Sequence, residues 1–283
     1  MTRPGEGRRG RASGTVVRYV LLVVGAAIMV VPFLTMLSTS FTGQAYVLTI
    51  PPQIIPNPAT LDNYAQALGT QDFAGYFLNS AIVSVLATAV AVLLSSMMAY
   101  GFARFDFPGK EVMFRLLLLG LVVPAMMLII PQFVLAKQLG LVDTLAGLVV
   151  FYVAGNLAFN TFLLRGFFAS LPGELDQAMQ VDGANAWTRY WRLAMPLAKP
   201  ALGTVTIFTF LSCWDEFAWA LTLIQTPDKA TLPLALSLFQ GENSTQWGLV
   251  FAGSVIAVIP VIIVFLVFQR SFVQGLTSGA VKG

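Results

Sequence analysis

Long uncharged stretches alternate with shorter polar segments along most of this chain. A membrane-spanning helix needs about 20 apolar residues to cross about 30 Å of hydrocarbon. Five uninterrupted stretches have about this length: 19–37, 73–103, 116–136, 144–164 and 243–269. A sixth stretch, 200–224, has a similar length but is interrupted by Asp215 and Glu216. With this sixth stretch included, the pattern predicts six spans in an all-α membrane protein.

The two ends of the chain lack such stretches. Residues 1–15 carry arginines among glycines and a serine, a composition that cannot bury a core, and we expect a disordered tail there. No small-residue cleavage site follows the first apolar stretch, so it is expected to be a retained span and not a signal peptide. The predicted organisation is therefore a tail at 1–15, a six-span domain at 16–272 and a second tail at 273–283.

The longest polar interval, 171–200, shows the periodicity of a helix. Leu175, Ala178 and Met179 are spaced so that they share one helical face. Gly183 follows at the place where a helix C-terminus favours a residue free to adopt positive φ. The interval is therefore predicted to form a helix-turn-helix hairpin between two spans.

Prolines mark the expected irregularities of the helices. Pro196 is predicted to end the second helix of the hairpin, which we expect at 184–193. Pro124 and Pro131 are seven residues apart and lie near one face of the third span. They are expected to loosen its backbone hydrogen bonding, either as hinges or as tolerated packing kinks.

The composition supports a polytopic membrane protein and excludes several chemistries. Hydrophobic residues make up 57% of the chain and charged residues 10%, with a mean hydropathy of +0.78, whereas soluble domains are about a quarter charged. The chain has no histidine and one cysteine, Cys213, which excludes disulfides, the common His or Cys metal sites, and Ser-His or Cys-His catalytic pairs. A GxxxxGK[ST] phosphate loop is also absent. We therefore expect no catalytic residue, no metal and no cofactor.

Basic residues follow the expected topology. Fourteen of the 16 lie in the N-terminal tail, in 104–115, in 165–199 and near the C-terminus, whereas Lys137 and Lys229 do not. The proline-rich segment 42–72 has none. Because basic residues accumulate on the cytoplasmic side, both termini and the hairpin are predicted to be cytoplasmic. This distribution also argues against a nucleic-acid-binding patch.

Short motifs occur in a characteristic order through residues 18–272. In the hairpin they are Pro172, Glu174, Leu175, Ala178, Asp182-Gly183-Ala184, Pro196-Leu197 and Pro200, and outside it LDNY at 61–64, NS at 79–80, AY at 99–100, AR at 103–104, FPGK at 107–110, LGL at 139–141 and WDEF at 214–217. Together they resemble the permease subunits of ABC importers, and more narrowly the carbohydrate-uptake, maltose-type branch, in which the hairpin is similar to the cytoplasmic EAA loop. The Glu-Ala-Ala triplet of that loop reads Gln177-Ala178-Met179 here.

This resemblance implies a type I ABC importer permease fold in a bacterial plasma (inner) membrane. It implies transport of a sugar or related polyol, driven by ATP hydrolysis in a separate subunit, so the chain itself is not expected to be an enzyme. The implied partners are a second permease in a heterodimer, two cytoplasmic ATPases, an extracytoplasmic solute-binding protein and the lipid bilayer. The implied coupling helix would contact an ATPase through Glu174, Leu175, Gln177, Ala178, Met179, Asp182, Gly183 and Ala184.

Two carboxylates within a span require an explanation, since each ionised one near the bilayer centre costs about 2.5 to 3.5 kcal/mol. One hypothesis is that Trp214, Asp215, Glu216 and Trp219 line the translocation path and offer oxygen acceptors and aromatic faces to a sugar. The alternative is that the carboxylates bind polar groups on neighbouring spans or hold the partner permease.

Asn156 and Asn160 form a polar stripe on the fourth span. Such a stripe serves either as interhelical hydrogen bonding or as a substrate contact.

Two other function classes remain open. In a proton-coupled secondary transporter, Asp215 or Glu216 would carry the proton. Such transporters often have inverted repeats, and the chain has a single long hairpin. A membrane scaffold without transport is the third class.

Overall fold

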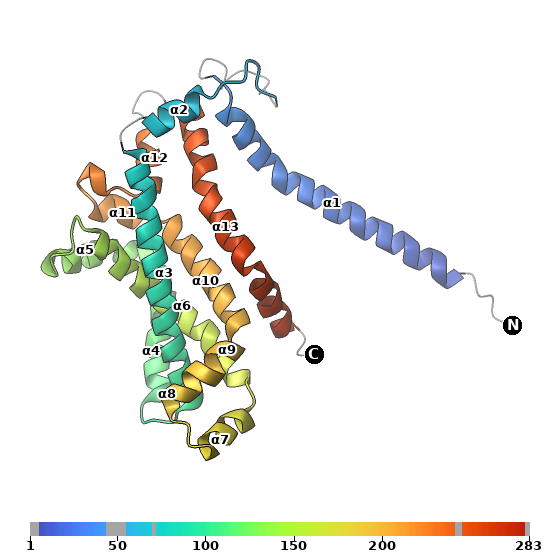
Figure 1. Cartoon of the computed structure of the whole chain (residues 1–283), viewed down its shortest axis with the longest axis vertical. Helices are drawn as coiled ribbons and strands as arrows, with labels where there is room; N and C mark the ends of the chain where they lie inside the picture. Colours follow the sequence, from blue (N-terminus) through green and yellow to red (C-terminus); the bar gives the residue numbers. More distant parts are fainter. Residues whose placement is uncertain (1–5, 44–54, 70–71, 241–244, 281–283) are drawn as a thin grey trace. The chain divides into compact units, whose positions relative to one another are not determined.

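The computed structural model describes residues 6–43, 55–69, 72–240 and 245–280. The chain forms two compact units, Met1–Thr70 with Phe239–Ile256, and Gln71–Leu238 with Ala257–Gly283. In chain order (Figure 1) the helices are α1 (Glu6–Ser40), α2 (Asp62–Gly69), α3 (Phe73–Arg104), α4 (Lys110–Val122), η2 (Ala125–Leu128), α5 (Ile129–Gln138), α6 (Leu145–Ser170), α7 (Gly173–Val181), α8 (Ala186–Arg189), η3 (Tyr190–Ala194), α9 (Met195–Leu197), α10 (Lys199–Trp214), α11 (Ala218–Leu223), η4 (Pro227–Lys229), α12 (Leu232–Leu238) and α13 (Trp247–Ala280).

The first unit contains α1, α2 and the start of α13. α1 begins at Glu6, within the segment expected to be a disordered tail. An 18-residue hydrophobic stretch of α1 contains no buried residue. Asn63 of α2 donates hydrogen bonds to the carbonyls of Ser40 (2.9 Å) and Thr42 (2.8 Å), and these bonds tie α2 to the end of α1. Most of the proline-rich segment preceding α2 lies outside the described residues.

The core of the second unit is built from α3, α6 and α10. α3 places small buried residues against its neighbours, and these allow the helix backbones to approach closely. Larger side chains, such as Leu148 and Phe168 of α6, fill the remaining space. The small buried residues of α3 include Ala87, Ala91, Ser95, Ser96 and Ala99.

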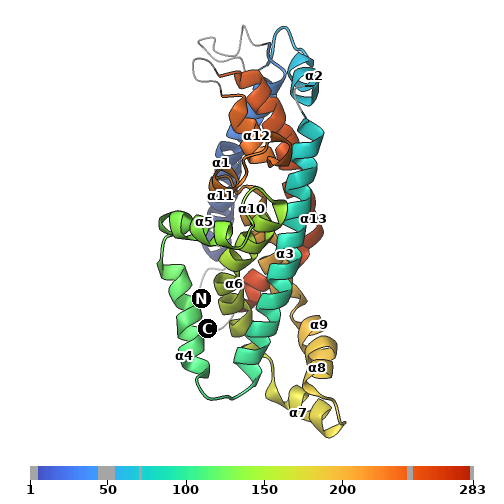
Figure 2. The ribbon, with the colours of Figure 1, turned by 90° about the vertical axis from the view of Figure 1, so that its left-hand side faces the viewer.

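The span expected over 116–136 is broken. α4 and the helices that follow it, η2 and α5, differ in direction by 95° (Figure 2). Pro124 lies at the break, and Val123 before it is extended with ψ 121°. Proline lacks an N–H and excludes the preceding residue from the helical region, which explains the position of the break. The loosening expected at Pro124 is observed, whereas Pro131 lies inside α5.

The second arm of the hairpin differs from the expectation that Pro196 would end its helix. α8, η3 and α9 continue through Pro196, and the helical path bends by 78° only before α10. η3 is a π-helical turn in which the Met195 N–H bonds the carbonyl of Tyr190, five residues back. This wider turn relieves the clash between a proline ring and the carbonyl four residues earlier.

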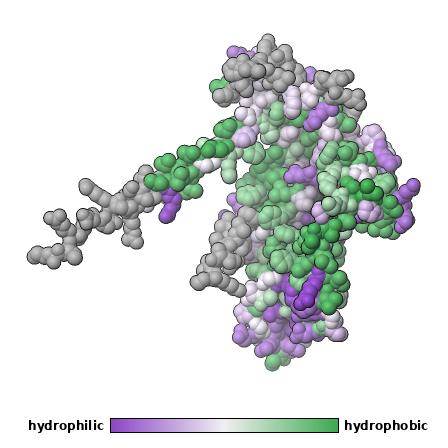
Figure 3. Space-filling model, turned by 180° about the vertical axis from the view of Figure 1, so that it is seen from behind, coloured by the Kyte–Doolittle hydropathy of each residue, from purple (hydrophilic) through white to green (hydrophobic). Residues whose placement is uncertain are grey.

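Four continuous helices, α1, α3, α6 and α13, are long and apolar enough to cross a membrane. Counting each of the two bent pairs as one span raises the number to at most six, the number expected from the sequence, but the second pair covers 186–214 whereas the fifth span was expected at 200–224. α13 continues to Ala280, into the segment expected to be a C-terminal tail. Hydrophobic side chains cover the middle of the face in Figure 3, and hydrophilic ones gather at the lower end, where Figure 1 places α7 and α8.

Candidate functional site

The first helix of the hairpin, α7, ends as its sequence predicts. Gly183 has φ +77° and no atom lies within 4 Å of where its Cβ would be, so the requirement for glycine comes from the backbone alone. The Ala184 N–H bonds the Met179 carbonyl at 2.9 Å, and the Gly183 N–H bonds the Gln180 carbonyl at 3.1 Å. This pair of bonds is a Schellman motif.

α7 exposes an apolar face. None of its residues is buried. Leu175 is 42% exposed and Val181 88% exposed, and Ala178 lies exposed between them. Among the predicted coupling residues, only Met179 and Ala184 are partly covered, while Glu174, Gln177, Asp182 and Gly183 are exposed. The hairpin therefore presents an uncovered apolar surface of the kind that a partner protein binds.

Sequence reasoning missed the residue that attaches α7 to the bundle. Asp176 forms an ion pair with Arg104, at the end of α3, with 3.2 Å between Oδ2 and Nε. A second, longer contact of 3.8 Å joins Asp176 Oδ1 to Arg189 Nη1 in α8. The acidic residue and the basic ones are far apart in sequence, so helical periodicity gives no signal of the pairing.

The interruption of the fifth span is a real break in the helix. α10 ends at Trp214 and α11 begins at Ala218. Glu216 accepts hydrogen bonds from the backbone N–H groups of Trp219 (2.7 Å) and Ala220 (3.1 Å), so its carboxylate caps α11.

The other residues of the predicted path differ in their surroundings. Trp214 is 2% exposed and donates its indole N–H to the Ala257 carbonyl at 3.0 Å. Trp219 stacks on Phe151 with 4.7 Å between ring centroids and 15° between planes. Asp215 is exposed, and its carboxylate has no hydrogen-bond or ion-pair partner among the described residues. Of these four residues, Asp215 is exposed, Glu216 and Trp219 are partly exposed, and Trp214 is buried.

The asparagine stripe of α6 faces α10. Asn160 is fully buried and donates to Thr209 Oγ1 at 2.9 Å. Asn156 is partly exposed, donates to the Tyr152 carbonyl at 2.8 Å and lies 3.8 Å from Cys213 Sγ. Asn160 therefore joins two helices, while Asn156 keeps part of its amide accessible.

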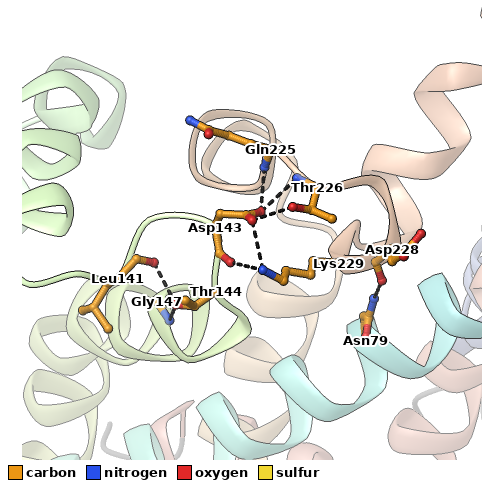
Figure 4. Close-up of polar contacts among 9 residues, drawn as sticks. All are labelled: Asn79, Leu141, Asp143, Thr144, Gly147, Gln225, Thr226, Asp228 and Lys229. Atoms are coloured by element: carbon orange, nitrogen blue, oxygen red, sulfur yellow. Dashed lines mark hydrogen bonds and ion pairs between the residues drawn. The ribbon is translucent and has the colours of Figure 1, made fainter.

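A polar cluster that the sequence did not indicate lies at the end of α3 away from the hairpin (Figure 4). The Asp143 carboxylate accepts hydrogen bonds from the N–H groups of Gln225 (3.0 Å) and Thr226 (2.9 Å) and from Thr226 Oγ1 (2.6 Å). Lys229 Nζ lies 2.9 Å from Asp143 Oδ2. Asn79 of α3 donates to the carbonyls flanking η4, those of Asp228 and Ala230. We call these residues the loop clasp, since they join the α5–α6 and α11–α12 connections.

The electrostatics of the loop clasp favour the ionised carboxylate. The hydrogen bonds from Thr226 and Gln225, together with that from Lys229, hold the pKa of Asp143 well below its usual range. In the sequence, Lys229 is one of two basic residues outside the group expected to be cytoplasmic, but nothing there pairs it with Asp143.

The described residues contain no cluster of three or more His, Cys, Asp or Glu side chains suited to a metal ion. The arrangement offers helices broken at Pro124 and at residues 215–217, an exposed carboxylate at Asp215 and an exposed apolar face on α7.

Comparison with known proteins gives concordant matches. Residues 91–278 match the family of binding-protein-dependent transport system inner membrane components. The chain is 34% identical over 268 residues to the diacetylchitobiose uptake system permease protein NgcG of Streptomyces coelicolor, covering 94% of this chain and 88% of that one. It is 35% identical over 276 residues to the trehalose/maltose transport system permease protein MalG of Thermococcus litoralis, covering 95% and 98%.

Among solved structures, the chain is similar to one in the crystal structure of a bacterial ABC transporter involved in the import of the acidic polysaccharide alginate. The TM-score is 0.81 at 27% identity, with 95% of this chain and all of that chain covered. These matches confirm the resemblance found from the motifs and the all-α fold.

Proposed function

Because the chain belongs to the family of binding-protein-dependent transport system inner membrane components, we propose that it forms half of the path of a bacterial ATP-driven importer for a sugar or related polyol. ATP hydrolysis belongs to a separate subunit. Relatives named for diacetylchitobiose, trehalose and trehalose/maltose transport support a saccharide cargo.

The observation that carries the coupling role is the exposed apolar face of α7. α7 has nine residues and none of them is buried, so packing of its apolar side chains within this chain contributes little, and those side chains are available to a partner. Leu175, Ala178 and Val181 supply the contact surface, and the Gly183 turn sets the direction in which the chain leaves it. The partner proposed for this face is a cytoplasmic ATPase.

The proposed complex contains this chain, a second permease, two ATPases and an extracytoplasmic solute-binding protein. The family description, a binding-protein-dependent system, supports the last of these. The distribution of basic residues supports cytoplasmic termini and a cytoplasmic hairpin.

For the cargo path, the accessible polar and aromatic groups at the break of the fifth span are the best candidates. The Asp215 carboxylate accepts hydrogen bonds from hydroxyl groups, and aromatic faces such as that of Trp219 pack against the C–H face of a sugar ring. Asn156 keeps part of its amide accessible. Trp214, Glu216 and Asn160 support this site by packing and hydrogen bonding within the chain.

In this mechanism, closure of the ATPases moves the hairpin, and the spans exchange an inward-open for an outward-open arrangement. Nucleotide state must favour different positions of the hairpin, and those positions must favour different states of the path. The breaks at Pro124 and at residues 215–217 are places where helices can change direction without losing further backbone hydrogen bonds.

Uptake in reconstituted vesicles tests the proposal. The chain, purified with its bound partners, is expected to accumulate a radiolabelled disaccharide such as trehalose, maltose or diacetylchitobiose only when ATP and a solute-binding protein are supplied. Uptake driven by a proton gradient without ATP would identify a secondary transporter. Absence of uptake of all these sugars would contradict the saccharide importer.

A further inference from the structure

The coupling helix α7 is attached to the rest of its unit through a single side chain. None of its residues is buried. In the part of the chain that the structure describes, every side-chain hydrogen bond or ion pair between α7 and another helix ends on Asp176.

The environment of Asp176 makes this attachment strong. Its side chain is 13% exposed, and those of Arg104 and Arg189 are 15% and 16% exposed. Two cations and the Tyr100 hydroxyl, 3.5 Å away, surround one carboxylate. Ion pairs that are largely shielded from water are screened less than surface pairs, and removing one partner leaves a charge that cannot recover its full hydration.

Arg104 connects this carboxylate to two spans. It is the last residue of α3, and its Nη2 donates to the Leu171 carbonyl, at the end of α6, over 2.8 Å. A displacement of Asp176 therefore pulls on the ends of α3 and α6 together.

The region behind Arg104 is well suited to transmit such a displacement. The Tyr100 ring packs against Phe168 of α6 and Tyr190 of η3, with centroid distances of 5.8 Å and 5.4 Å. The Tyr190 and Ser96 hydroxyls are 2.6 Å apart. Because these side chains are in direct contact, we expect the ends of α3 and α6 and the second hairpin arm to move together.

We propose that Asp176 is the positioning residue that carries movement of α7 to the ends of α3 and α6, and so links the ATPase contact to the spans. This inference rests on the proposed function of α7 as the coupling helix. Asp176 does not itself contact nucleotide or cargo; without its charge, α7 moves independently of the bundle.

The test compares Asp176→Asn with a matched substitution, Asp106→Asn. Asp106 is also a carboxylate paired with a base, Lys110 at 3.2 Å, but its side chain is fully exposed and lies outside α7. Both variants are purified with bound ATPase, and the number of solute molecules imported per ATP hydrolysed is measured in vesicles. Asp176→Asn is expected to keep the ATPase bound and to lose about 5-fold or more in this ratio, the lower end of coupling factors between sites. Asp106→Asn should match the wild type.

The conservative variant and a second measurement separate positioning from folding. Asp176→Glu keeps the charge and is expected to recover at least half of the import ratio. Amide hydrogen exchange, measured on the full chain without ATPase, should become about 5-fold or more faster in α7 of Asp176→Asn, while α3 is unchanged.

The outcomes distinguish this inference from the function on which it rests. If no ATPase accompanies the wild-type chain, the proposed function fails, and the exchange measurement still reports whether Asp176 holds α7. Unchanged exchange in α7, or an import ratio of Asp176→Asn equal to that of wild type, overturns the positioning role. Equal losses in Asp106→Asn would also overturn it.

Discussion

The Tyr152 hydroxyl of α6 donates a hydrogen bond of 2.6 Å to Glu216 Oε2, at the break between α10 and α11. The same carboxylate accepts the N–H groups of Trp219 and Ala220. One acidic side chain thus satisfies the start of α11 and joins it to a neighbouring span. This arrangement gives the carboxylate of Glu216 a structural role and leaves that of Asp215 accessible.

We predict that Glu216→Ala lowers the free energy of unfolding by about 2 kcal/mol, the size of a lost helix cap together with an unpaired hydroxyl. Glu216→Gln keeps an acceptor oxygen and should cost less. Asp215→Asn, one residue away, should leave stability unchanged because its carboxylate has no partner among the described residues. Thermal unfolding of the three variants in detergent measures the difference. Equal effects of Glu216→Ala and Asp215→Asn would contradict the capping role.

The loop clasp should persist at acidic pH. The pKa of Asp143 is held below its usual range in the folded chain, so its ionised form contributes stability above the ordinary carboxyl pKa of about 3.9. This contribution is lost only as pH falls through the lower folded-state pKa. The stability difference between wild type and Asp143→Asn is therefore expected to be constant from about pH 7 to pH 5 and to shrink below about pH 4.

Unfolding midpoints of the wild type and Asp143→Asn across this pH range test the prediction. Lys229→Met provides a partner variant, since it removes the cation 2.9 Å from Asp143 Oδ2 but keeps the bonds from Thr226 and Gln225. Lys229→Met should therefore remove only part of the stability difference between the wild type and Asp143→Asn. A difference that does not shrink below about pH 4 would show that folding leaves the pKa of Asp143 unchanged.

Asn160 and Thr209 are predicted to stabilise the contact between α6 and α10. Their hydrogen bond of 2.9 Å is fully buried, and such bonds between membrane helices contribute about 0.6 to 1.7 kcal/mol. A double-mutant cycle of Asn160→Ala and Thr209→Val, followed by unfolding in detergent, should give a coupling energy in this range. A coupling energy of zero would indicate that the pair contributes nothing beyond packing.

The sequence predicted the four continuous spans, α1, α3, α6 and α13, because the length of a span is set by the thickness of the bilayer and is a local property of the chain. It also predicted the turn at Gly183, since the requirement for positive φ is a property of one residue. Pro124 indicated where the third span would weaken, but the 95° bend depends on packing in three dimensions. The prediction that Pro196 ends the second helix of the hairpin was wrong, because a π-helical turn accommodates the proline ring.

The ion pairs could not be predicted from the pattern of residues along the sequence. Asp176 with Arg104, and Asp143 with Lys229, are pairs of opposite charge separated by long stretches of chain. Periodicity reports only neighbours within a helix. The functional roles of the hairpin and of the path residues are predictions that the uptake and copurification experiments test.

The most direct test of the central claim is copurification of an ATPase with the tagged chain in detergent. Gly183→Arg places a long cation at the turn of the hairpin, where the isolated chain has open space. Gly140→Arg is its matched control, because Gly140 also has positive φ (+68°) and open space around it but lies outside the hairpin. Both variants carry a backbone penalty of about 1 to 2 kcal/mol, so any difference between them reflects the surface and not the strain.

We expect wild type and Gly140→Arg to bring down an ATPase, and Gly183→Arg to remain folded without it. That result would establish the hairpin as the contact that couples ATP hydrolysis to transport. An ATPase retained by Gly183→Arg at the wild-type level, or absent from the wild type even after crosslinking, would contradict this account.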